Sequence, residues 1–169
     1  WSNDRWGRNS SGMPPEKNGD FAWIQHMISS LKNNGRMAVV LPQGALFRMG
    51  SEGKIRKNIL KEDILECVIG LGPNLFYGAG LCATILILNK NKSSLKKDKF
   101  LVIDAREQIS VERAQNKMYE QHIEHIFELY QNFENIEGES KIVELSELEK
   151  NQWNLNIPRS RSSSLAVLS

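Results

Sequence analysis

The chain has 169 residues, of which 40% are hydrophobic and 25% are charged, proportions that are ordinary for a globular protein and exclude a largely disordered chain. The 22 Lys and Arg residues against 20 Asp and Glu residues give a formal net charge of +2, so composition neither favours nor excludes a nucleic-acid partner. The two cysteines, Cys67 and Cys82, lie in apolar runs, which argues against a disulfide framework and favours a reducing cytoplasm.

The residue pattern alternates between helical and strand-like segments. Residues 1–19 are rich in Ser, Asn, Gly and Pro and predict a flexible loop. From Asp20, a suitable N-cap, apolar residues recur at helical spacing, and Asn34–Gly35 is a suitable C-cap. The short apolar run Met37–Leu41 then predicts a strand that is covered on both faces.

The following segments predict a helix at residues 51–60 and strands at 64–71 and 82–89. Only a short loop joins the two strands. Because a parallel connection needs a crossover of about a dozen residues or more, these strands are expected to be antiparallel.

A lysine-rich turn that includes Lys92, Lys96 and Lys97 leads into a fourth predicted strand, Phe100–Asp104. Lysine supplies a mobile positive charge that can contact DNA phosphates, and a solvated hairpin tip is the alternative interpretation. The longest predicted helix follows at residues 112–133. Its predicted inward stripe consists of Ile123, Ile126, Phe127, Tyr130 and Phe133.

Three histidines, His26, His122 and His125, lack metal-ligand companions at useful spacing. We interpret them as residues on helix faces and predict no metal site.

Two adjacent aromatic residues, Phe76 and Tyr77, precede the strand at 82–89 on a turn that contains Gly78 and Gly80. Such a turn can hold aromatic faces at a sheet edge, where stacking on a flat heterocycle contributes ~1–3 kcal/mol per base. The alternative interpretation is that both rings belong to the hydrophobic core.

Six segments in a fixed order connect this sequence to a known family. They are Gly19–Ile28, Asn34–Pro42, Gly44–Arg48, Ser51–Lys57, Asn74–Gly80 and Asn154–Arg159. Their order and spacing closely resemble the methyltransferase (M) subunit of type I restriction-modification systems. The resemblance extends from about Gly19 to Arg159.

The resemblance implies a DNA adenine methyltransferase that transfers a methyl group from S-adenosylmethionine to the exocyclic amine of adenine. It also implies a specificity subunit that reads the DNA sequence and a restriction subunit that consumes ATP. The family binds its cofactor through a glycine-rich turn and acts through an Asn-Pro-Pro-aromatic motif, and this sequence has neither. Its only Pro-Pro pair, Pro14-Pro15, follows Met13. We therefore expect the second half of the catalytic domain, inactive on its own.

The resemblance also suggests residue roles. By position, Phe76 is the aromatic residue that packs against a flipped adenine, with Tyr77 as the alternative. Trp23 occupies the position that lines the pocket for the adenine of S-adenosylmethionine, where M subunits more usually carry Phe. Packing in the core or against the missing half of the domain is the alternative. Asp20 lies beside it and is either part of the cofactor site or only an N-cap.

Together these observations predict an α/β fold, a partial Rossmann-like methyltransferase sheet that ends in an antiparallel strand. The family resemblance implies that strand 82–89 lies between strands 37–41 and 64–71, antiparallel to both. The predicted divisions are a loop at 1–19, the half-domain at 20–110, a helical extension at 111–159, and a non-native or disordered tail at 160–169. The alternatives are a non-catalytic assembly module and an RNA or protein methyltransferase of the same fold.

Overall fold

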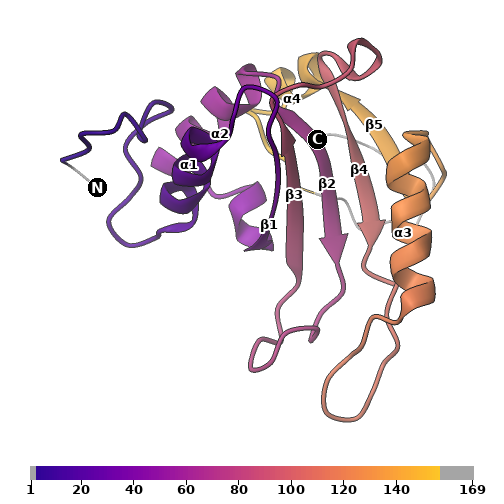
Figure 1. Cartoon of the computed structure of the whole chain (residues 1–169). Coiled ribbons are helices and arrows are strands. Elements are labelled where there is room, and N and C mark those ends of the chain that lie inside the picture. The colour runs from indigo at the N-terminus through magenta and orange to yellow at the C-terminus, as the bar shows by residue number, and fades with distance from the viewer. Residues whose placement is uncertain (1–2, 157–169) are drawn as a thin grey trace.

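The computed structural model describes residues 3–156, which form one open sheet with helices packed against it (Figure 1). In chain order the elements are α1 (Asp20–Ser30), β1 (Arg36–Pro42), η1 (Gln43–Leu46), α2 (Ser51–Lys61), β2 (Leu65–Leu71), β3 (Ala83–Asn89), η2 (Ser94–Lys96), β4 (Lys99–Ala105), α3 (Glu120–Asn132), β5 (Ser140–Glu144) and α4 (Leu145–Lys150). Within this part of the chain, every helix is too short or too polar to cross a membrane. The predicted tail at 160–169 lies outside the described residues.

The strand order in the sheet is β1-β3-β2-β4-β5. Strand β3 lies between β1 and β2 and is antiparallel to both, which confirms the predicted insertion. Strands β2 and β4 form the one parallel pair, and β5 pairs antiparallel with β4. Because β1, β2 and β4 run in the same direction, their carboxyl ends meet at one edge of the sheet, the lower edge in Figure 1.

The two faces of the sheet have separate hydrophobic cores, because successive strand residues point to opposite faces. Phe100 of β4 packs with Ile24 of α1 and Ile55 of α2 in the first core. The next residue of β4, Leu101, packs in the second core with Ile126 of α3. The predicted inward position of the apolar residues of α2 is confirmed.

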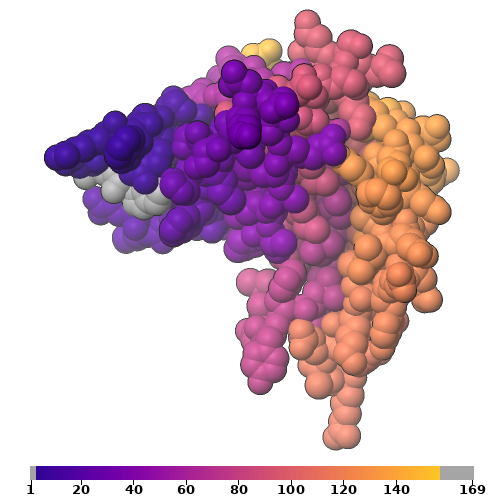
Figure 2. Space-filling model, in the orientation of Figure 1, coloured from indigo at the N-terminus to yellow at the C-terminus, as the bar shows by residue number. Residues whose placement is uncertain are grey.

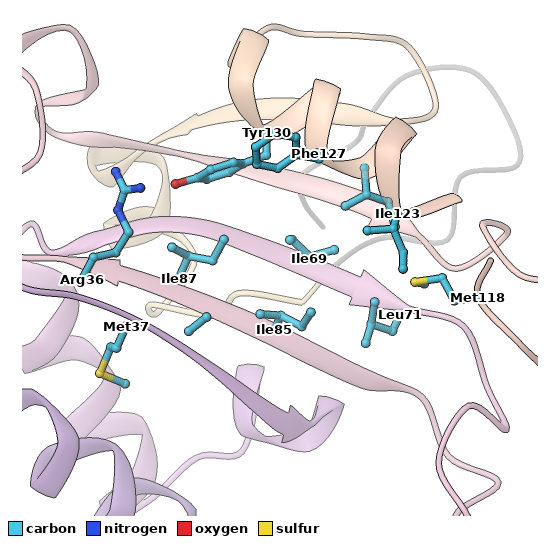
Figure 3. Close-up of a pocket in the computed structure, with 12 residues that line it drawn as sticks. Arg36, Met37, Ile69, Leu71, Ile85, Ile87, Met118, Ile123, Phe127 and Tyr130 are labelled. Atoms are coloured by element: carbon cyan, nitrogen blue, oxygen red, sulfur yellow. The ribbon is translucent and has the colours of Figure 1, made fainter. Parts of the chain in front are cut away.

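Helix α3 covers the second face only in part. Beside it, an apolar groove with a volume of about 580 Å³ remains open over β3 and β1. Figure 3 shows Ile123, Phe127 and Tyr130 of α3 along one side of the groove and Ile85 and Ile87 of β3 on its floor. The sheet therefore exposes apolar side chains, as expected of a partial domain.

Strand β1 is not covered on both faces, and that prediction is wrong. Its residues are mostly half-buried or exposed, and Leu41 alone is fully buried. In the described part of the chain β1 pairs with β3 only, so it is an edge strand.

The start of the long helix was also predicted wrongly. Helix α3 begins at Glu120 rather than at residue 112, because Ser110 and Lys117 bond to each other through both backbone N–H groups and close a loop. Of the predicted inward stripe Ile126 is buried, whereas Ile123 and Phe127 are each 54% exposed and border the groove.

Both predicted caps of the first helix are wrong, although the helix itself is confirmed. Gly19 is the N-cap and Leu31 is the C-cap, in place of Asp20 and Asn34–Gly35. The Asp20 carboxylate binds Arg48 instead of the helix backbone.

Strand β5, within the segment expected to be a helical extension, was not predicted. Only two of its five residues, Ile142 and Val143, are apolar. Residues 3–19 contain no helix or strand, yet Ser11 is buried and its N–H donates to the Gln25 side chain at 3.1 Å.

Candidate functional site

A tight turn presents two aromatic rings at the sheet edge where β2 ends. The turn spans Phe76–Ala79 and is closed by the Ala79 N–H, which donates to the Phe76 carbonyl at 3.0 Å. Gly78 has a φ of +71°, a conformation that favours glycine at the third position of such a turn. Phe76 is 41% exposed and Tyr77 is 97% exposed. Both rings therefore face solvent rather than filling the core.

Trp23 is a third exposed aromatic residue, at 60% exposure, on the first turn of α1. Its ring lies beside Gly19, where an added Cβ would be 3.6 Å from the indole Cδ1 and Nε1 atoms. The His26 ring meets it edge-on, with the ring centroids 6.1 Å apart. The indole is therefore a surface group rather than part of the hydrophobic core of this chain.

Asp20 connects α1 to the loop that follows β1. Its carboxylate accepts a hydrogen bond from the Arg48 guanidinium, which also donates to Glu52 from Nε at 2.6 Å and from Nη2 at 3.0 Å. The hydrogen bonds to Glu52 and Asp20 raise the pKa of Arg48 despite partial burial. Because its charge is paired with Arg48, Asp20 fixes the start of α1.

A second arginine, Arg56 of α2, lies buried beneath this loop. Its Nε donates to the Trp153 carbonyl at 2.8 Å, and its Nη1 donates to the carbonyls of Arg48 at 2.8 Å and Ala45 at 3.2 Å. Burial lowers the pKa of Arg56. Sequence reasoning missed this residue. The available signal was an arginine between the inward-facing positions Ile55 and Ile59 of an amphipathic helix.

The lysine-rich turn lies at the opposite end of the sheet from Phe76, because it follows the antiparallel strand β3. The Lys92 ammonium pairs with Asp63 and donates to the Lys99 carbonyl at 2.9 Å. Lys96 pairs with Glu66 at 2.9 Å, and Lys97 is exposed. The structure thus does not bring these lysines together with the aromatic turn, and their contact with DNA stays a prediction.

Glu66 of β2 is the buried centre of a polar cluster that the sequence did not indicate. Its carboxylate accepts from Lys96 at 2.9 Å and from Asn89 at 3.0 Å, and pairs with Arg36 at 3.3 Å. Burial alone would raise the pKa of Glu66, but the hydrogen bonds from Lys96 and Asn89 outweigh it and hold the pKa below its ordinary value. Burial, with Glu66 nearby, raises the pKa of Tyr130 to about 12.

Two of the histidines contact neighbouring groups, and Cys67 is buried. His122 Nδ1 accepts from the Tyr119 N–H at 3.0 Å, and His125 Nε2 lies 2.9 Å from a Glu139 carboxylate oxygen. Burial raises the pKa of the Cys67 thiol, which disfavours the reactive thiolate. Between residues 3 and 156, no group of three or more His, Cys, Asp or Glu side chains could hold a metal ion.

The chemistry available at this edge is therefore stacking. The exposed pair Phe76 and Tyr77 follows the carboxyl end of β2, and the exposed Trp23 follows Asp20, whose carboxylate binds Arg48 in the loop beyond the carboxyl end of β1. In open α/β sheets this is the end at which ligands bind. Aromatic faces there suit flat heterocycles.

Comparison with known proteins identifies close relatives. The methylase subunit of the type I restriction enzyme MjaVII from Methanocaldococcus jannaschii is 41% identical over 149 residues, covering 86% of this chain and 26% of that protein. The HindI methylase subunit from Haemophilus influenzae is 42% identical over 97 residues, covering 57% of this chain and 21% of that protein.

Solved structures agree with these relatives. The methyltransferase subunit of a type I restriction-modification system from Streptococcus thermophilus aligns with a TM-score of 0.84 and 38% identity, covering 90% of this chain and 32% of that one. The EcoKI M protein aligns with a TM-score of 0.70 at 19% identity, which supports the fold alone.

This chain spans about a quarter of the length of the curated methylase subunits that it matches over most of its own length. The N-6 DNA methylase family matches residues 1–165, nearly the whole sequence. The chain belongs to the N-6 DNA methylase family.

Proposed function

We propose that this chain is the second half of the catalytic domain of a type I DNA adenine methyltransferase subunit. The whole subunit would transfer a methyl group from S-adenosylmethionine to the exocyclic amine of a target adenine. The family match and the 41% identical methylase subunit support this activity. The observation on which the proposal depends most is the exposed aromatic turn at the sheet edge.

In this proposal the turn stacks on the target base. An adenine inside duplex DNA must be flipped out before its amine can react, at a cost of a few kcal/mol. Stacking on an aromatic face offsets ~1–3 kcal/mol of that cost. Phe76 is the proposed stacking ring because it is exposed yet still adjoins the partly buried Leu75. Tyr77 is the alternative ring.

Trp23 and Asp20 fit the adenine end of the methyl donor. S-adenosylmethionine supplies the methyl group as a sulfonium, and its adenine is a flat ring that an exposed aromatic side chain such as Trp23 suits. Asp20 would act through Arg48 by fixing the helix start that carries Trp23. In this proposal Trp23 and Asp20 supply only part of the cofactor site, so we expect the isolated chain to bind S-adenosylmethionine weakly.

The contribution of this chain to catalysis would be positional. Holding two reactants in the reactive geometry accelerates a transfer without any acid or base from the chain itself. We further propose that the whole subunit works on DNA in the cytoplasm with a specificity subunit and a restriction subunit. The free, partly or fully buried cysteines Cys67 and Cys82 support the reducing compartment.

Methyl transfer by the whole methyltransferase subunit that contains this chain tests the proposal. Assembled with its specificity subunit and a target duplex, Phe76→Ala should lower kcat/KM by roughly 5- to 150-fold, the rate equivalent of ~1–3 kcal/mol of stacking. Leu95→Ala is the matched control, because Leu95 is an exposed apolar residue at the other end of the sheet. Full activity in Phe76→Ala would contradict the stacking role.

A further inference from the structure

We propose that Gln115 and Asn116 are positioning residues that hold the aromatic turn where it can stack on the target base. They lie in the loop 106–119, which joins β4 to α3. The inference rests on the proposed function, since it assigns these residues an effect on methyl transfer that acts through Phe76. We call the set of hydrogen bonds from Gln115 and Asn116 to residues 73–75 the clasp.

The clasp bonds each of three consecutive carbonyls that precede Phe76. Asn116 Nδ2 donates to the Pro73 carbonyl at 2.9 Å, and the Asn116 backbone N–H donates to the Asn74 carbonyl at 3.0 Å. Gln115 Nε2 donates to the Leu75 carbonyl at 2.8 Å. Asn116 is buried although it belongs to a loop. A buried side-chain amide that donates to a backbone carbonyl holds the two segments in a fixed relative position.

The aromatic turn needs such a support. Strand β2 ends at Leu71 and β3 begins at Ala83, so residues 72–82 lie outside the strand pairing. Asn74 has a φ of +56° and Gly78 a φ of +71°, so the segment follows an irregular path. Its internal bridge joins only Phe76 and Ala79. Contacts from another part of the chain must therefore set the orientation of the turn relative to the sheet.

The two loops are also built to approach closely. A Cβ at Gly72 would lie 2.6 Å from the Arg106 carbonyl oxygen and 2.8 Å from Ile109 Cδ1, so only glycine allows this distance. The supporting loop has its own closure, since Ser110 and Lys117 exchange backbone hydrogen bonds of 2.8 and 3.0 Å. Figure 2 shows both loops projecting from the same lower edge of the molecule.

Loss of the clasp should therefore affect catalysis more than folding. A stacking ring contributes to the transition state only when it is held in position before the base arrives. If the clasp is broken, the sheet keeps its core while the turn samples other orientations. Methyl transfer then slows because part of the stacking energy orders the turn.

The experiment is a double-mutant cycle in the whole methyltransferase subunit. Asn116→Ala should lower kcat roughly 5- to 30-fold, the equivalent of 1–2 kcal/mol, with little change in Tm. In the Phe76→Ala background the same substitution should change kcat less than twofold, because its effect acts through that ring. Backbone hydrogen exchange at residues 74–81 should accelerate in Asn116→Ala while exchange in β2 and β3 is unchanged.

Two further variants keep the result interpretable. Gln115→Ala removes only the hydrogen bond to the Leu75 carbonyl. It replaces Asn116→Ala in the double-mutant cycle if that variant folds poorly. Gln121→Ala, at an exposed position on α3, is the matched control and should behave as wild type. Wild-type kcat in both clasp variants, or losses that multiply with that of Phe76→Ala, would overturn the clasp. A Phe76→Ala enzyme with full activity would instead overturn the proposed function.

Discussion

The two ends of the sheet handle their polar and aromatic residues in opposite ways. At the end where the parallel strands begin, Glu66, Lys96 and Lys92 are paired within the protein. At the end where they terminate, Phe76, Tyr77 and Trp23 leave much of their aromatic surface in solvent. Of the lysines that suggested DNA binding, Lys92 and Lys96 are thus paired within the protein and Lys97 is exposed, and the rings that could have been core are exposed. Substitutions at the first end should change stability, and those at the second end should change binding.

Arg56 tests whether buried hydrogen bonds also stabilise the end of the sheet that carries the exposed rings. Its substitution should give the largest loss of unfolding free energy. Arg56→Met leaves the buried carbonyls of Ala45, Arg48 and Trp153 without their donor. Since each unsatisfied buried acceptor costs ~1–3 kcal/mol, we expect the free energy of unfolding to fall by about 3 kcal/mol or more. Urea unfolding of the chain measures it, with the exposed Lys54→Met as control. A loss below about 1 kcal/mol would show that the three carbonyls find other partners.

Glu66 tests the paired end directly. Glu66→Gln weakens charged hydrogen bonds to Lys96 and Asn89 and should lower the free energy of unfolding by about 1.5–3 kcal/mol at neutral pH. Because folding lowers the pKa of this carboxylate, its contribution is complete above the unfolded-state pKa and is lost as the pH falls through the lower folded-state value. The difference between wild type and variant should therefore shrink below about pH 4.

Unfolding curves at several pH values give the measurement for Glu66. Glu62→Gln, at an exposed position at the end of α2, is the control and should leave the stability unchanged. A wild-type-to-variant difference that stays constant from neutral to acid pH would mean that the ionised carboxylate is not the stabilising form.

Trp23 tests the binding end of the comparison. Trp23→Ala should weaken S-adenosylmethionine binding by the whole subunit roughly 5- to 30-fold, the equivalent of ~1–2 kcal/mol of stacking. Trp23→Phe should retain most of the affinity, because it keeps an aromatic face. With the side chain 60% exposed, Tm should change little in either variant. Calorimetric titration measures the affinity. A large fall in Tm with unchanged affinity would mean that Trp23 stabilises the fold rather than binding the cofactor.

The elements that could be predicted from the sequence are those with continuous local signals. The apolar runs predicted β2, β3 and β4, and the short loop between β2 and β3 predicted that this pair is antiparallel, whereas the position of β3 between β1 and β2 came from the family resemblance. Strand β5 could not be predicted, because Lys141 and Glu144 interrupt the apolar pattern of a strand. Pairing with β4, a contact distant in the sequence, stabilises it. The start of α3 depends on bonds between residues 110 and 117, which override local helix propensity.

The exposed rings of the candidate site could be predicted from the sequence. The hydrogen-bond partners of its charged and buried polar residues could not. Phe76 and Tyr77 lie on a turn whose glycines are visible in the sequence. The local sequence around Asp20 is typical of an N-cap, but its carboxylate binds Arg48, which is 28 residues away. Likewise, Asn116 reaches Pro73 across 43 residues. Contacts over such distances depend on the fold rather than on local pattern, so one sequence alone does not reveal them.

Tyr77 should show the smallest effect and sharpens the comparison within the aromatic turn. The clasp bonds the Leu75 carbonyl directly before Phe76, whereas Tyr77 lies at the tip and is 97% exposed. A ring that must be ordered on binding contributes less binding free energy than a ring already held in position, because side-chain ordering costs about 0.5–1.5 kcal/mol. Tyr77→Ala should therefore lower kcat/KM less than about fivefold, below ~1 kcal/mol, and leave the unfolding free energy within about 0.5 kcal/mol of wild type. Methyl transfer and thermal unfolding measured beside Phe76→Ala decide the order. If Tyr77→Ala is the more damaging substitution, the base stacks on the tip of the turn, and the clasp supports Tyr77 rather than Phe76.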